Sequence, residues 1–265
     1  QISQGSQQLF TKILKGRRPQ PFRKATFINL DRIRCSVHEL SQYTPTDEMI
    51  WKFIRSTNLR RLHRELFWKS IHNIFRVGDF WTHIENLETI VVCPTCAVPE
   101  SLEHIAMECD ASGAKLIWQL TEKLWSMKYS NWPILSWGLI LGCNLVKFKH
   151  SNGKIIPAMG RLFAILVSTA WHTIWNIRND KVLKNPHRNI TDVEIHNRWL
   201  KSVNSALGRD RILTNKIKFG NLALNKDLVL RTWSGLLMNE DALPDDWTYT
   251  VGVLVGIHCT AIEIK

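Results

Sequence analysis

Three cysteines and one histidine lie close together with the spacing C-x2-C-x7-H-x4-C. They are Cys93, Cys96, His104 and Cys109. Two thiolates separated by two residues can both face one ion, because the short loop between them reverses direction around it. A histidine and a cysteine on the helical turn that follows supply the other two corners of a tetrahedron. The spacing therefore predicts a metal site with these four residues as its ligands.

The donor types in this string suit Zn²⁺, and we expect zinc as the cofactor. Four protein ligands leave no open position for water, which predicts a structural rather than a catalytic site. The alternative is that the cysteines are small buried apolar side chains without a metal. The remaining cysteines, Cys35, Cys143 and Cys259, are too isolated for a disulfide framework. This usage indicates a reducing intracellular compartment, nuclear or cytoplasmic.

A short H-x-E element, His83-Ile84-Glu85, precedes the cysteines and invites comparison with the zinc nucleobase deaminases. The match fails because no proline precedes Cys93 and only seven residues separate the two elements. His83 stays open as a fifth candidate ligand, although the favoured interpretation is a histidine that is hydrogen-bonded within a turn. The chain also lacks a Walker-type phosphate loop, a G-x-S-x-G elbow and an H-E-x-x-H helix. We therefore expect no catalytic activity from this chain.

The predicted ligands depend on short elements with helices on either side. Thr89–Val92 is expected to pair as a strand with the cysteine turn, and Ser101 to cap the short helix that carries His104. A helix over 114–128 follows. A helix over 59–77 precedes, with Asn58 as its cap and Gly78 at its end. The metal should fix the relative placement of these two longer helices.

One half of the predicted helix 59–77 is basic and aromatic. Apolar residues such as Leu66 and Phe67 fall on the opposite side. Cations could meet phosphates, and rings could stack on bases. Alternatively, Trp68 and Phe75 pack on a neighbouring helix while the charges are solvated. The candidate nucleic-acid contacts are Arg61, Arg64, Trp68, Lys69, His72 and Arg76.

The whole chain is basic. Its 265 residues carry a formal net charge of +12, which favours a polyanionic partner such as RNA or DNA, although some basic proteins have none. The stretch Lys15–Lys24 is either a phosphate-contacting arm or a solvated linker. The most apolar run, Leu162–Val167, is too short to span a bilayer, and the start of the sequence has no charged segment followed by an apolar core, so we expect no signal peptide and no membrane partner.

Hydrophobic periodicity predicts a mainly α protein with a small amount of β structure. The spacing of the cysteines and the histidine adds a CCHC zinc knuckle to this fold. Further helices are expected at 1–15, 25–42, 45–55 with Thr44 as cap, 158–184 ending in cations such as Arg178, and 191–207 with a Thr191/Glu194 capping box. Asn152-Gly153 signals a turn, and 249–257 is β-like. We predict a helical lead-in and basic linker at 1–43, a zinc-binding domain at 44–140, and a helical extension with an irregular tail at 141–265.

The string from Cys93 to Cys109, with Glu100-Ser101-Leu102-Glu103-His104 inside it, resembles the zinc-binding C-terminal region of non-LTR (LINE-like) retrotransposon reverse transcriptases. Four further stretches are similar to stretches of the fungal type, where this region lies behind a ribonuclease H domain: Thr44–Trp51, Ile195–Trp199, Thr232–Gly235 and Leu243–Trp247. Ala97 departs from the pattern, because a glycine often follows the second cysteine. Neither polymerase nor ribonuclease H motifs are present in this chain.

The resemblance implies an accessory module of a retroelement-derived protein that binds nucleic acid without base specificity and that works beside other domains of that protein. Two alternatives remain. The chain could be a protein-interaction scaffold in which zinc only staples the fold. It could also be the C-terminal fragment of a ribonuclease H and reverse transcriptase polyprotein.

Overall fold

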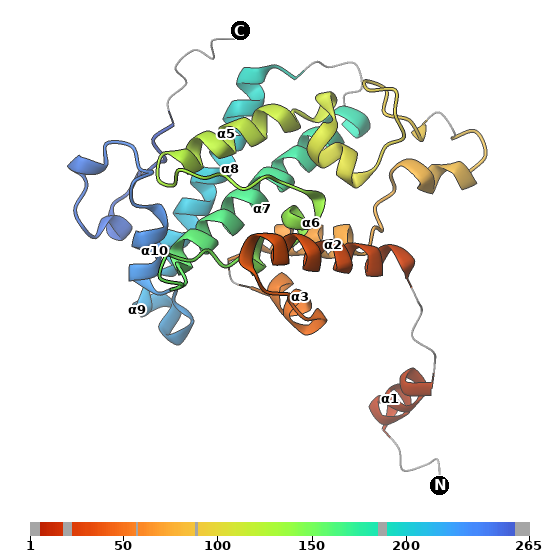
Figure 1. The fold of residues 1–265 in the computed structure, drawn as a ribbon, viewed down its shortest axis with the longest axis horizontal. Coiled ribbons are helices and arrows are strands. Elements are labelled where there is room, and N and C mark those ends of the chain that lie inside the picture. The colour runs from red at the N-terminus through yellow and green to blue at the C-terminus, as the bar shows by residue number, and fades with distance from the viewer. Residues whose placement is uncertain (1–5, 18–22, 57, 88–89, 185–189, 258–265) are drawn as a thin grey trace.

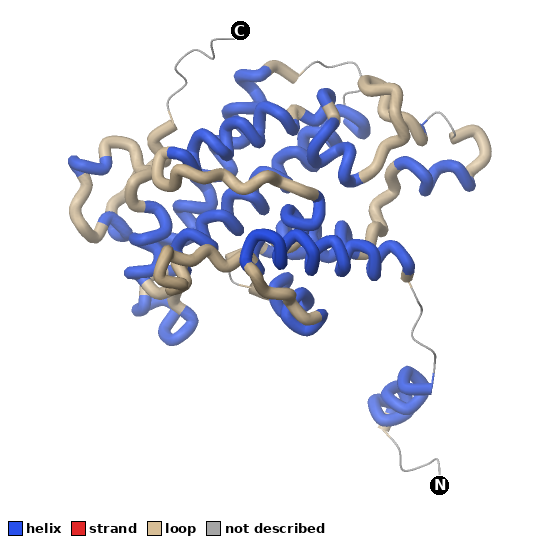
Figure 2. The backbone as a smooth tube through the Cα atoms, viewed as in Figure 1, coloured by secondary structure: helices blue, strands red, loops and turns tan. Residues whose placement is uncertain are grey.

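The computed structural model describes residues 6–17, 23–56, 58–87, 90–184 and 190–257. Within these ranges the backbone forms helices joined by loops, as Figure 2 shows, and its β pairing consists of three isolated bridges. The predicted mainly α class is therefore confirmed. The α-helices are α1 (Gln7–Arg17), α2 (Lys24–Ser41), α3 (Asp47–Ile54), α4 (Arg61–Ile71), α5 (Ala114–Ser126), α6 (Trp137–Leu141), α7 (Pro157–Asn179), α8 (Asp192–Leu213), α9 (Lys216–Phe219) and α10 (Lys226–Trp233).

The longest helix, α7, lies at the centre of the molecule (Figure 1). Pro157 begins it, where a missing N–H and a fixed φ suit the first helical position. Its residues are apolar on nearly every side, which is the pattern of a helix buried all round. Helices α4, α5, α6, α8 and α10 pack against it. Four tryptophans with almost no exposed surface fill the space between them: Trp125, Trp171, Trp199 and Trp233.

The buried side chains form one continuous cluster from Leu30 to Ile257, which includes residues on both sides of the predicted boundary at 140/141. Trp199 Nε1, in α8, donates to Thr121 Oγ1, in α5, over 3.1 Å. The turn at Asn152-Gly153 is confirmed, because Lys149 bridges Ile155 and Gly153 has a φ of +80°. The three predicted domains stay a prediction, and 44–140 and 141–265 share this core. Figure 1 shows α1 apart from the helical body.

Helix α4 is shorter than predicted. It ends at Ile71 rather than at Val77, because Asn73 adopts a left-handed φ of 47° and closes the end with two reverse hydrogen bonds. Asn73 N donates to Ser70 O and Ile74 N donates to Lys69 O. This is the Schellman arrangement, which usually takes glycine but tolerates asparagine. Gly78, predicted to end this helix, instead begins a 3-10 turn over Gly78–His83.

Two predicted caps are wrong and two are confirmed. Thr46, not Thr44, caps α3 by accepting from Met49 N over 3.3 Å. Asn58 does not cap α4, and its Nδ2 donates to Asn144 Oδ1 over 2.9 Å. Thr191 caps α8 as predicted, accepting from Glu194 N, and Ser101 accepts from His104 N over 3.0 Å. The free energy of a helix terminus depends on such contacts by about 0.5–2 kcal/mol.

The C-terminal third also differs from the prediction. Helix α8 continues through Gly208 to Leu213. The β-like run at 249–257 contributes only the bridge between Leu237 and Val255, because a 3-10 turn, Trp247–Tyr249, and a turn at Gly252 interrupt it. Cys259, residues 18–22 of the basic linker, Thr89 of the predicted strand and the side chain of Lys184 lie outside the described residues.

Candidate metal centre and the adjoining basic helix

Cys93 and Cys96 lie at the tip of a tight hairpin. Val92 bridges Pro99, Cys93 N donates to Val98 O over 2.8 Å, and Ala97 N donates back to Cys93 O over 2.9 Å. Ala97 has a φ of 55°, in the left-handed region where a side chain costs about 1–2 kcal/mol. This is the position where the resembled family often has glycine. The hairpin places both cysteine side chains on one side of the turn.

His104 and Cys109 lie at the two ends of one π-helical turn, His104–Glu108. The turn closes with Cys109 N donating to His104 O over 2.8 Å, an i to i+5 bond. The wider turn carries one residue more than an α-turn would. Single π-turns of this kind are frequent at functional sites. Here the wider turn brings the Cys109 side chain back toward the imidazole of His104.

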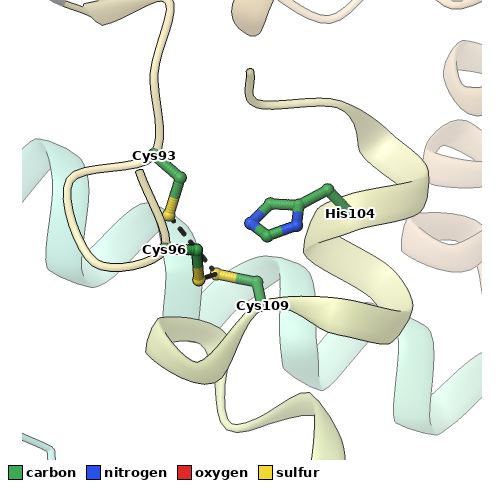
Figure 3. Close-up of side chains that lie close together, drawn as sticks. All are labelled: Cys93, Cys96, His104 and Cys109. Carbon is green, nitrogen blue, oxygen red and sulfur yellow. Dashed lines mark hydrogen bonds between the residues drawn. The ribbon is translucent and has the colours of Figure 1, made fainter. Parts of the chain in front are cut away.

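The four predicted ligands meet at one point, and Figure 3 shows their side chains converging. One ligand atom from each lies within 4.8 Å of all the others. Cys93 Sγ is 3.7 Å and Cys96 Sγ is 3.9 Å from Cys109 Sγ. A disulfide would need about 2.05 Å, whereas a tetrahedral ion at a Zn–S distance of about 2.3 Å separates two sulfurs by about 3.8 Å. The residues could hold a metal ion, and the sulfur spacing fits zinc.

The imidazole of His104 is arranged as a ligand would be. It is 4 % exposed, and neither ring nitrogen has a hydrogen-bond partner among the described residues. Nδ1 lies 3.5 Å from Glu108 Oε2, too long for a good hydrogen bond, and the ring points toward the sulfurs (Figure 3). Buried polar nitrogens without partners are costly. A bound cation would satisfy the nitrogen that faces the cysteines.

The thiols also fit a cation. Burial opposes ionisation of Cys93, but His104 and the backbone amides of Cys96 and Thr95 outweigh it and lower its pKa to about 7. Burial and the neighbouring Cys93 thiolate raise the pKa of Cys109. Several thiolates so close together cannot all ionise without a counter-charge. A divalent ion supplies that charge and deprotonates the thiols that coordinate it.

A buried ion pair anchors this hairpin to α7. Arg178 Nε donates to Glu100 Oε1 over 3.0 Å, and Arg178 Nη2 pairs with Glu100 Oε2. The two side chains are 8 % and 5 % exposed. Glu100 belongs to the sequence string but is not among the four grouped residues, and its pairing with Arg178 accounts for its burial. This role was not predicted, because Arg178 was expected only as one of the cations at the end of the helix over 158–184.

A second set of contacts fixes the hairpin from the other side. Trp118 Nε1, in α5, donates to Ala106 O in the π-turn over 2.7 Å. Gly78 has a φ of +50°, and a Cβ there would lie 1.8 Å from Glu100 O. Glycine is therefore required where the chain after α4 passes the hairpin. The candidate metal site thus lies where α5, α7 and the segment after α4 meet.

Five of the six predicted nucleic-acid contacts lie on α4 or at its end. Arg61 and Trp68 are exposed, Trp68 by 44 %, while Arg64, Lys69 and His72 are half-buried. Arg76 follows the end of α4 and is exposed, so it does not continue the helical face as predicted. Its guanidinium lies 5.5 Å from the centre of the Phe80 ring.

Neighbouring side chains occupy part of this face. Lys69 Nζ pairs with Glu65 Oε1 over 2.5 Å. The His72 ring stacks on Trp51 at 5.1 Å and meets Trp68 edge-on at 4.6 Å. His72 Nδ1 also bonds Thr26 Oγ1 over 2.9 Å. His72 therefore packs edge-on against Trp68, and the Trp68 side chain remains 44 % exposed.

The alternative prediction for the aromatic residues holds for one of them. Phe75 packs against Trp175 of α7 with ring centres 4.3 Å apart, so it belongs to the interior. His83, the fifth candidate ligand, does not join the four-residue group. Cys35 and Cys143 are free thiols outside it, the first exposed and the second fully buried.

Comparison with known proteins does not assign the chain to a family, because no protein-family model, curated protein or solved structure matches it. No helix in the described ranges has both the length and the apolar character needed to cross a bilayer. The chemistry of the site therefore rests on its own residues.

Proposed function

We propose that Cys93, Cys96, His104 and Cys109 hold a structural zinc ion. Three thiolates and one imidazole are a common zinc donor set, and four protein ligands exclude a reactive water. When bound, the ion neutralises the clustered thiolates. The protein's own residues do the rest: the hairpin presents two ligands, the π-turn presents two, and Glu100 with Arg178 ties the assembly to α7. The centre stabilises the fold and performs no reaction.

We further infer that the chain is a non-catalytic nucleic-acid-binding accessory module of a retroelement-derived protein. One observation carries this proposal, namely the exposed face of α4, where Trp68 stands open beside Arg61 and Arg64. An open ring between cations suits a single strand, whose bases stack and whose phosphates need positive charge. The net charge of +12 supports the same class of partner. The retroelement origin rests on the sequence resemblance alone.

Salt dependence tests the binding. The zinc-loaded chain should bind single-stranded RNA or DNA with log Kd rising linearly with log[salt]. Trp68→Ala should weaken binding by about 1–3 kcal/mol at every salt concentration, because it removes stacking but no charge. Arg61→Ala should weaken binding and reduce the salt slope by about 1. Lys123→Ala on α5 is a matched control, since Lys123 is exposed on another helix.

A protein-interaction scaffold is the second candidate, and exposed apolar side chains around the hairpin favour it. Phe80, Ile84, Ile90, Val92 and Val98 are each between 38 % and 43 % exposed. Apolar side chains gathered on one surface often mark a protein interface. A chain that binds neither RNA nor DNA, or binds with no salt dependence, would contradict the nucleic-acid proposal and support this one.

A further inference from the structure

A group of arginines converges on the N-terminus of α4 from three helices. Arg60 immediately precedes α4 and Arg64 lies within it, whereas Arg161 belongs to α7 and Arg209 to α8. Only Arg64 stands among the residues that the sequence predicted as nucleic-acid contacts. Arg161 and Arg209 are distant from α4 in the sequence, and the packing of α4 against α7 and of α7 against α8 brings them close to it.

Backbone carbonyls hold two of these side chains in place. Arg64 Nε donates to Leu59 O over 3.1 Å, and Arg209 Nη2 donates to Asn58 O over 3.1 Å. The two carbonyls belong to consecutive residues, and the charge of Arg64, after burial, is among the causes that lower the pKa of Arg209, so the two guanidinium groups lie within electrostatic reach of each other. Both arginines are only half-buried, so each keeps a side toward solvent.

Positive charge exceeds negative charge at this point. The fully buried Asp210 pairs with Arg161 over 2.7 Å and lies 3.6 Å from Arg209. Arg161 is 4 % exposed, and its Nη2 has no hydrogen-bond partner among the described residues. Neither Arg60 nor Arg64 forms an ion pair with any acidic residue that the structure describes. Asp210 therefore places one negative charge beside Arg161 and Arg209, and Arg60 and Arg64 add two positive charges that no described acidic residue pairs.

The pKa values of nearby groups are lowered in part by the same excess of positive charge. Burial, followed by the charges of His172, Arg60 and Arg209, lowers the pKa of His63 to about 3. Burial and then Arg60 also lower the pKa of His172. For Arg209, burial is the largest cause of a lowered pKa, and the guanidinium of Arg161 adds to it. An anion placed here would relieve this repulsion.

The helix terminus adds its own donors. Arg60 is the N-cap residue of α4, and no side chain caps the helix there. The N–H groups of the first turn have no intrahelical acceptors, and the helix dipole places partial positive charge at the same end. Together with guanidinium forks, which match tetrahedral phosphate oxygens, these amides complete the chemistry of a phosphate site.

We propose that the N-terminus of α4, together with Arg60, Arg64 and Arg209, binds a phosphate group. A backbone phosphate of RNA or DNA and a free phosphate ion present the same oxygens. The nucleic-acid source rests on the function proposed above, whereas the phosphate site does not. If the strand is the source, this site anchors its backbone at the start of α4 while Trp68 stacks on a base further along the helix.

Inorganic phosphate tests the site directly, by ³¹P NMR titration of the zinc-loaded full chain. Arg60→Glu should weaken phosphate binding on the order of tenfold or more. It should leave the fold intact, because the Arg60 side chain makes no hydrogen bond or ion pair with the described residues. Lys123→Glu makes the same change of charge on α5 and should leave phosphate binding within about twofold of the original. Arg60→Gln provides a second variant without a new negative charge.

A single-stranded RNA with or without a 5′-phosphate, and the matching DNA, separates the two sources. Arg60→Glu should weaken strand binding and reduce its salt slope, and Lys123→Glu should do neither. Equal phosphate binding by the two glutamate variants overturns the site. Strand binding that survives Arg60→Glu unchanged overturns the backbone role while the proposed function stands. Phosphate binding without strand binding supports the site and overturns the proposed function.

Discussion

At the scale of single residues, two carboxylates close together in the sequence should differ greatly in importance. Glu100 pairs with Arg178, with side chains 5 % and 8 % exposed. Glu103 pairs with Arg32, with side chains 41 % and 47 % exposed. Removing one partner of a buried pair strands the other charge away from water, which costs about 3–5 kcal/mol. An exposed pair contributes about 0–1 kcal/mol, because water screens both charges.

We predict that Glu100→Gln lowers the free energy of unfolding by about 3–5 kcal/mol and that Glu103→Gln lowers it by less than about 1 kcal/mol. Urea unfolding of the metal-loaded chain measures both. The two substitutions are chemically identical, so burial is the variable that distinguishes them. Equal losses in the two variants would show that the pair at Glu100 does not anchor the hairpin.

The residues that could be predicted here are those whose chemistry is local in sequence. The four candidate ligands fall within one short string, and their spacing alone was enough to predict that they would meet. Arg178 could not be assigned a partner, because Glu100 lies 78 positions away and its pairing depends on how α7 passes the hairpin. Asn73 offered a local signal that was missed, since asparagine tolerates the left-handed conformation that ends α4.

At the scale of elements, the hairpin over 90–100 and the π-turn that follows have few interactions of their own. The hairpin has one bridge, between Val92 and Pro99, and its tip carries the left-handed Ala97. An isolated two-stranded ribbon is marginally stable in water. The metal should therefore supply much of the free energy that orders these elements, as structural zinc does in small metal-binding domains.

Cys109→Ser should accordingly abolish stoichiometric metal binding, and the amides of the hairpin and π-turn should lose protection from hydrogen exchange. Cys143→Ser is the matched control, because Cys143 is equally buried but lies outside the group of four. That variant should keep one equivalent of metal. Metal analysis by mass spectrometry, with hydrogen exchange on both variants, makes the comparison. A full equivalent of metal retained by Cys109→Ser would exclude the site.

Element types were predictable where periodicity or capping was strong, as in α2, α5, α7 and the start of α8. The predictions failed where tertiary contacts override local preference. Asn29 in α2 donates to Ser70 O and Ile71 O, and thereby satisfies the last carbonyls of α4. The apolar run at 249–257 satisfied a strand pattern, but Val255 found one partner in Leu237 rather than a sheet. No window of local sequence contains either partner.

At the scale of the whole molecule, the other helices pack around α7, and the apolar composition of α7 predicts that it is buried. A helix that is apolar on nearly every side must be surrounded. Which helices surround it could not be predicted, because any amphipathic helix offers a compatible face. Those contacts also create the buried polar region between α4, α7 and α8, where His63 meets Ser168 over 3.3 Å.

That buried histidine should couple the stability of the molecule to pH. Burial, the neighbouring His172, and the charges of Arg60 and Arg209 lower the pKa of His63 to about 3, against about 6.5 in an unfolded chain. Above pH 6.5 the ring is neutral in both states and contributes no pH dependence. As pH falls from about 6.5 toward 3, the unfolded state binds a proton that the folded state cannot, so stability decreases. The limiting slope is about 1.4 kcal/mol for each pH unit.

His63→Gln removes this proton and keeps a polar group opposite Ser168. The variant should be less stable than the original at pH 7, where the native packing of His63 is intact. The difference should shrink by about 1.4 kcal/mol per pH unit below pH 6.5. The metal ligands also take up protons in this range, but they do so in both chains, so the difference between the two unfolding curves isolates His63. Parallel stability curves from pH 7 to pH 4 would mean that His63 is protonated in the folded state and that α4, α7 and α8 do not enclose it.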